Sequence, residues 1–186
     1  VQTYLLGAGA VIDWLGELAR HHDRRIAVRL VKGAYWDSEI KTAQVLGSAR
    51  YKVFTHKPAS DVSYTAHART LIGMADRLYP QFATHNAQTM AAILEMAGDS
   101  RNFEFQRLHG MGAALHALVH AEYGTACRIY APVGAHSDLL AYLVRRLLEN
   151  GANSSFVNQI FDNKVQVERV VADPLATAEA ALAKGW

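Results

Sequence analysis

Short apolar runs alternate with helix-like segments along this chain, and no hairpin turn separates one run from the next. Each run is rich in β-branched or aromatic residues and leads into a segment with helical spacing or helix start and stop signals. Strand followed by helix, at least four times in succession, indicates parallel strands with right-handed crossovers. We therefore expect an α/β fold, either a doubly wound sheet or a (β/α) barrel. The strands are expected at 26–32, 80–84, 103–106 and 127–131.

The other elements are predicted from apolar spacing and from glycine and proline positions. Helices are expected over about 11–22, 37–47, 61–74, 87–97, 113–123, 137–150 and 174–184, with Asp61 and Asp173 as caps. Two further extended stretches are expected at 1–5 and 53–58. The first of them reads as a strand already under way, so the chain is expected to be a fragment of a larger protein.

Polar and aromatic side chains gather at the carboxyl ends of the expected strands, where parallel α/β proteins place their chemistry. They are Arg29 with Lys32, Thr55 with Lys57, His85 with Asn86, Gln106 with His109, and Tyr130. An open sheet concentrates its ligands at one switch point, so polar groups from many consecutive strands favour a barrel. Neither GxGxxG nor GxxxxGK[ST] occurs, which removes the usual nucleotide-binding motifs.

The stretch from Ile26 to Glu39 is the strongest candidate for function. An apolar run that carries Arg29 and Lys32 ends at Gly33, as a buried strand does where it enters a loop. The alternative is an ordinary core strand whose two cations reach solvent at its end.

The helix expected at 137–150 has two different sides. Its apolar stripe is predicted to face the core and comprises Leu139, Leu140, Leu143, Val144, Leu147 and Leu148. A second side carries Tyr142, Arg145, Arg146 and Glu149. Adjacent arginines beside a tyrosine can clamp a carboxylate. The alternative is an exposed face with an i,i+4 ion pair between Arg145 and Glu149.

Composition restricts the class of protein. With 186 residues, 51% of them hydrophobic, the chain can bury a real core. The net charge of +2 is too small for a nucleic-acid partner. The single cysteine excludes an internal disulfide and a cysteine cluster, so no metal site is expected. No apolar run reaches the ~18 residues of a spanning helix, so we expect a cytoplasmic protein.

Five ordered segments together resemble the proline dehydrogenase domain of bacterial proline utilization A: Arg29–Glu39, Gln81–Asn86, Phe105–Gly112, Arg128–Gly134 and Tyr142–Phe156. The resemblance implies a (β/α)8 TIM-type barrel, of which residues 1–158 are roughly the C-terminal half. It implies FAD as cofactor and oxidation of L-proline to Δ1-pyrroline-5-carboxylate, with membrane quinone as electron acceptor. It also implies a cytoplasmic protein that can lie peripherally at the inner membrane. Residues 159–186 resemble the linker and short helix that lead toward a downstream glutamate-semialdehyde dehydrogenase domain.

The resemblance also implies roles for individual residues. The proline site would take the carboxylate on Arg145 and Arg146 and pack the ring against Tyr130 and Tyr142, with Tyr35 also in the substrate site. Arg29 would lie at the flavin N5. The other residues expected along the cofactor are Gln2, Val31, Lys32, Gly33, Ala34, Trp36, Thr55, Lys57, Thr84, His85, Asn86, Gln106, Glu149, Ser155 and Phe156. Gly33 is expected to let the backbone approach the cofactor.

Two alternatives belong to other classes. Family members carry a substrate-binding lysine and an aspartate that would precede Val1, so the chain is alternatively a non-catalytic fragment or assembly module without flavin. The other alternative is a barrel lyase or aldolase that uses Lys32 as a Schiff-base amine.

Overall fold

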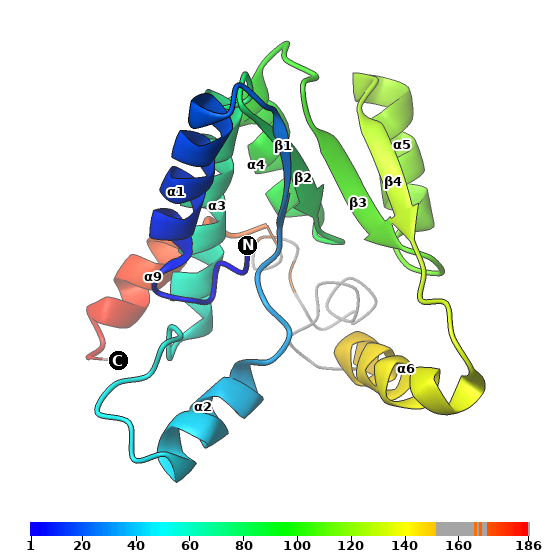
Figure 1. The fold of residues 1–186 in the computed structure, drawn as a ribbon. Helices are drawn as coiled ribbons and strands as arrows, with labels where there is room; N and C mark the ends of the chain where they lie inside the picture. The colour runs from blue at the N-terminus through cyan, green and yellow to red at the C-terminus, as the bar shows by residue number, and fades with distance from the viewer. Residues whose placement is uncertain (152–165, 167, 169–170, 186) are drawn as a thin grey trace.

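The computed structural model describes residues 1–151, 166, 168 and 171–185. Within them a parallel sheet forms from β1 (Ile26–Leu30), β2 (Leu78–Ala83), β3 (Glu104–Leu108) and β4 (Ala126–Tyr130). The strands pair in chain order, with Leu30 opposite Phe82 and Phe82 opposite Phe105 (Figure 1). Each strand therefore adds beside the previous one in the same direction, and the described sheet has no switch point.

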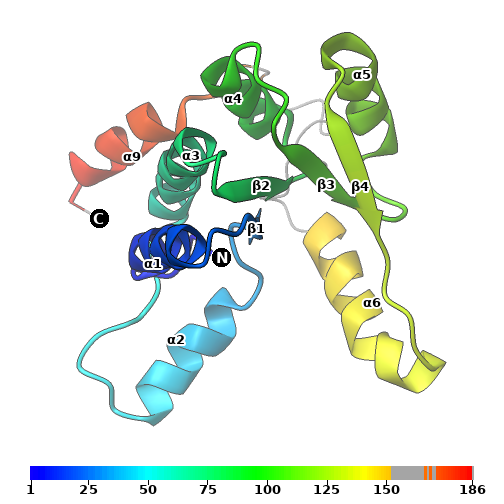
Figure 2. The ribbon, with the colours of Figure 1, turned by 45° about the horizontal axis from the view of Figure 1, so that its top comes forward.

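The described helices are α1 (Ala8–His21), α2 (Trp36–Val45), α3 (Lys57–Gly73), α4 (Ala87–Ala97), α5 (Ala113–Tyr123), α6 (His136–Gly151) and α9 (Pro174–Leu182). Helices connect the strands, and α1, α3, α4 and α5 cover one face of the sheet (Figure 1). The core lies between the sheet and α1, α3, α4 and α5, while α2 and α6 lie beyond the carboxyl ends of the strands (Figures 1 and 2). Asp173 caps α9 as predicted, because its side chain accepts from the Leu175 N–H at 2.9 Å.

The two faces of the sheet have different chemistry. Val28, Leu30 and Phe82 point into the helix-covered core and are fully buried. Several of the alternate residues carry charge or amides instead, among them Arg29 and Arg128, which are exposed. Because side chains alternate along a strand, one face builds the core and the other presents a polar inner surface.

The segment 1–5 is not a strand. Gln2 forms an isolated parallel bridge with Val31, and Leu5 an isolated antiparallel bridge with Val53. Helix α1 begins at Ala8, so only a few residues remain for pairing. The chain still lies beside the end of β1, since the Thr3 N–H donates to the Val31 carbonyl at 2.8 Å.

The prediction of an extended stretch at 53–58 is also wrong in part. Helix α3 starts at Lys57, with His56 as its N-cap and Pro58 in its first turn. Proline suits the first turn of a helix because its missing N–H has no partner there in any case. Asp61 therefore lies inside the helix and does not cap it.

The part of the predicted α6 stripe whose side chains the structure describes does not join the core. Leu140, Leu143 and Val144 are 54, 42 and 45% exposed. Other helices already cover the core face of the sheet, and α6 lies beyond the strand ends instead (Figure 1).

Helix α9 packs on α3 and buries Ala178. The expected boundary between 158 and 159 lies outside the described residues.

No helix in the described ranges is both long and apolar enough to cross a lipid bilayer.

Candidate active site

The first and last strands of the sheet approach each other across its inner face. The Arg29 guanidinium on β1 lies over the Tyr130 ring on β4, 4.4 Å from the ring centroid. Three strand spacings would separate β1 from β4 by about 14 Å in a flat sheet. Contact between these side chains therefore indicates a concave sheet, as an arc of a barrel requires. Two predicted residues, one for cofactor and one for substrate, are brought together here.

Two lysines share one carboxylate at the start of α3. Lys32 Nζ lies 2.6 Å from Asp61 Oδ1, and Lys57 Nζ lies 2.7 Å from Asp61 Oδ2. Burial lowers the pKa of Lys32, and Asp61 works in the opposite direction. Burial works to raise the pKa of Asp61, but the two ammonium groups outweigh it and lower that pKa.

The ion pair of Lys32 bears on the Schiff-base alternative. An adjacent carboxylate favours the ammonium form of a lysine, whereas a Schiff-base nucleophile must be neutral. The ion pair with Asp61 therefore favours a cation that binds an anion, while burial, the larger effect on the pKa of Lys32, acts in the other direction.

The loop after β2 is shaped by its own polar side chains. Thr84 Oγ1 accepts from the Asn86 N–H at 3.1 Å, and Asn86 Oδ1 accepts from the Thr89 N–H at 2.9 Å to cap α4. These bonds hold His85 between the ends of β2 and β3. His85 Nε2 accepts from the Leu108 N–H at 3.1 Å.

The charge state of His85 follows from its surroundings. Burial, with lesser contributions from His116, Arg146 and Arg107, lowers the pKa of His85 to about 4. The ring is therefore neutral near pH 7. Since Nε2 accepts a hydrogen bond, the ring proton is on Nδ1.

Gln106 belongs to a polar network on the inner face. Glu104 Oε1 accepts from Gln81 Nε2 and from Gln106 Nε2, each at 2.8 Å. Arg128 donates to both carboxylate oxygens, at 2.7 and 2.9 Å. Burial works to raise the pKa of Glu104, but these donors outweigh it and lower that pKa. The network fixes the Gln106 amide, with its NH2 group turned toward Glu104.

Helix α6 reaches the loop after β1. Arg145 donates a hydrogen bond to the Tyr35 hydroxyl, and its guanidinium lies 4.6 Å from the Tyr35 ring centroid. Arg146 lies over the Tyr142 ring at 5.4 Å. On the same loop, Trp36 Nε1 donates to the Phe54 carbonyl at 2.6 Å. The residues predicted for the substrate thus form two cation–aromatic pairs.

Some residues predicted for the site lie at a different position from the one expected, or are explained by packing. Thr55 is exposed and does not follow a strand, although Lys57 still reaches Lys32 through Asp61. Gly33 has φ +129°, and a Cβ there would lie 2.5 Å from the Tyr4 ring. The close packing of Tyr4 therefore suffices to require this glycine. The side chain of Glu149, with Ser155 and Phe156, lies outside the described part of the chain.

Two residues of the site were not predicted. Asp61 was expected only as a helix cap, although its position four residues after Lys57 is an i,i+4 pairing signal. Glu104 was expected only as a strand residue. An acid between two phenylalanines of the expected strand, Phe103 and Phe105, is itself a signal, because a buried carboxylate requires donors.

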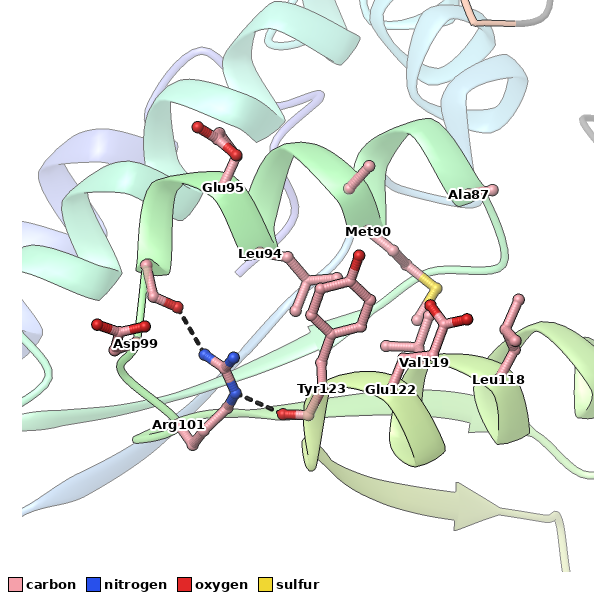
Figure 3. Close-up of a pocket in the computed structure, with 12 residues that line it drawn as sticks. Ala87, Met90, Leu94, Glu95, Asp99, Arg101, Leu118, Val119, Glu122 and Tyr123 are labelled. Carbon is pink, nitrogen blue, oxygen red and sulfur yellow. Dashed lines mark hydrogen bonds between the residues drawn. The ribbon is translucent and has the colours of Figure 1, made fainter.

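A hollow between α4 and α5 lies on the other side of the sheet (Figure 3). Arg101 closes one end by donating to the carbonyls of Tyr123 and Gly98, each at 2.6 Å. None of the predicted site residues lines it.

The donors at the strand ends fit an anionic, ring-bearing cofactor. Arg29, Lys32 and Lys57 supply positive charge, and His85 and Asn86 add polar groups on the adjoining loop. Cations suit a diphosphate or a reduced flavin. This donor set is compatible with FAD.

The family model described as "Proline dehydrogenase" matches residues 1–159. The Bifunctional protein PutA of Rhizobium meliloti is 55% identical to this chain over 186 residues, which are 97% of this chain and 15% of that protein. The Bifunctional protein PutA of Escherichia coli K12 is 52% identical over 96% of this chain and 14% of its own length. The chain thus spans about one seventh of these relatives.

A solved structure of proline utilization A with proline bound in remote sites has a TM-score of 0.91 and 56% identity. The match covers 95% of this chain and 18% of that one. The expected fold, an incomplete (β/α)8 TIM-type barrel, is thereby confirmed.

Proposed function

The chain belongs to the proline dehydrogenase family, and on that premise we propose that it is the FAD-binding part of an enzyme that oxidises L-proline to Δ1-pyrroline-5-carboxylate. The observation that carries the proposal is the gathering of Arg29, Lys32 and Tyr130 at the carboxyl ends of β1 and β4, the first and last strands of the described sheet. In a parallel barrel, catalytic groups collect at the carboxyl ends of the strands.

The cofactor is proposed to lie along the loops after β1, β2 and β3. FAD, when bound, supplies the hydride acceptor. Arg29 would stabilise negative charge at the reduced ring, because a guanidinium attracts an anion placed beside it. Lys32 and Lys57 hold the anionic groups of the cofactor. The neutral His85 ring and the fixed Gln106 amide offer hydrogen bonds without adding charge.

Proline is proposed to bind between the sheet and α6. Arg145 and Arg146 hold the carboxylate, and fixing that group orients the ring for hydride loss. Tyr130, Tyr142 and Tyr35 pack on the apolar part of the substrate. Support comes from the cation–aromatic pairs, which place a tyrosine ring beside each of these arginines.

The electron acceptor and the further domain are part of the same proposal. We assign membrane quinone as the acceptor and a cytoplasmic location with peripheral contact at the inner membrane. A downstream glutamate-semialdehyde dehydrogenase domain is proposed because the relatives are named bifunctional.

The visible absorption spectrum, recorded before and after addition of FAD and then of proline, tests the proposal. Flavin bands that bleach with proline are expected. A chain that keeps no flavin bands once the unbound FAD has been removed would contradict cofactor binding and favour the alternative of a non-catalytic module.

A further inference from the structure

The Asp61 carboxylate joins two lysines that come from separate elements. Lys32 follows β1, and Lys57 is the first residue of α3. Each ammonium group contacts a different oxygen of the one carboxylate, at 2.6 and 2.7 Å. The Asp61 side chain is only 16% exposed, so it is held by its packing as well as by its partners.

We propose that Asp61 is a positioning residue, which holds the ammonium groups of Lys32 and Lys57 side by side so that both address the diphosphate of FAD. The inference rests on the proposed function, since it takes FAD as the ligand. Asp61 itself does not touch the cofactor. It acts through the two lysines.

Electrostatics explains why a carboxylate is useful between two cations. Two ammonium groups this close repel each other, and an intervening carboxylate offsets that repulsion. The three groups together still carry one net positive charge, so an anion remains attracted.

Position within α3 supports the same role. Lys57 and Asp61 are four residues apart and lie on one side of the helix. Lys32 also lies 5.8 Å from the Tyr64 ring centroid, and Tyr64 is fully buried. Lys32 is thus held between a rigid ring and Asp61, whereas Lys57 is 66% exposed and depends on Asp61 for its direction.

A role for Asp61 as a competitor of the cofactor predicts the opposite change in FAD affinity. If Asp61 merely competed with the cofactor for the lysines, removing its charge would strengthen FAD binding. The sign of the change in FAD affinity therefore separates positioning from competition.

The test is FAD titration of the intact protein, freed of flavin, as wild type, Asp61→Asn and Asp61→Glu. We expect Asp61→Asn to raise the Kd for FAD about tenfold. This is the change expected when one lysine is no longer held against the diphosphate and its ionic contact is lost. Asp61→Glu restores the charge with a longer side chain, so its Kd should fall between the other two, about threefold above wild type. Asp23→Asn is the matched control, because Asp23 forms an exposed pair with Arg77 on another part of the surface and should leave the Kd unchanged.

Each outcome is decisive. An unchanged or lower Kd in Asp61→Asn overturns the positioning role while leaving the proposed function intact. A wild-type protein that binds no FAD overturns the proposed function itself. If circular dichroism shows that Asp61→Asn does not fold, the Asp61→Glu variant alone is the test. A Kd for FAD equal to that of the wild type in Asp61→Glu then overturns the inference.

Discussion

Arg145 and Tyr35 are 110 residues apart in the chain and lie in contact, with the Arg145 guanidinium 4.6 Å from the centre of the Tyr35 ring. The contact joins α6 to the loop after β1. It also orients one of the two arginines proposed to hold the carboxylate of proline.

Replacing Arg145 with Met should weaken proline binding and leave FAD bound. The guanidinium supplies charge and hydrogen bonds that Met lacks, so we expect the KM for proline to rise about tenfold or more. Steady-state kinetics with the flavin content measured in parallel checks this. Arg20→Met, on the exposed side of α1, is the control. Unchanged proline kinetics in Arg145→Met would remove Arg145 from the substrate site.

His85 should make the protein less stable as the pH falls from about 6.5 to about 4. The folded-state pKa of about 4 lies below the ordinary 6.5. The unfolded chain therefore takes up a proton in this window while the folded protein does not, and folding loses up to about 3 kcal/mol.

The check is urea unfolding at pH 7 and pH 4.5 of the wild type and His85→Gln. Glutamine keeps an acceptor for the Leu108 N–H but does not titrate, so the loss of stability on acidification should be smaller in the variant. His22→Gln, at an exposed position, should behave as wild type. Equal losses in all three proteins would contradict a buried neutral His85.

Gly33→Ala should destabilise the protein by about 1–3 kcal/mol, because the backbone there has φ +129° and the new methyl group meets the Tyr4 ring at 2.5 Å. Thermal or urea unfolding measures the change. Gly73→Ala is the matched control, since a Cβ there meets nothing within 4 Å and the helix should gain slightly. Similar effects at the two glycines would argue against packing of Tyr4 as the reason for Gly33.

Much of the local structure could be predicted from the sequence. Helices α4 and α5 span the predicted residues, and the strand carrying Arg29 was expected because β-branched residues lead into a glycine. Local signals failed where a tertiary partner decides the secondary structure. An example is the segment 1–5, which has single bridges to Val31 and Val53. They also failed for α6, whose apolar stripe indicates a helix but not the surface against which it packs.

The sequence by itself determined the parallel α/β architecture, the strand ends at which the site is proposed and, through its motifs, the family. These depend on spacing and residue type, which are local. Only the tertiary structure decided which side chains meet: Arg29 with Tyr130, Arg145 with Tyr35, and Lys32 with Lys57 through Asp61. The physical reason is that such contacts depend on sheet curvature and on side-chain direction, and neither is a property of a single segment.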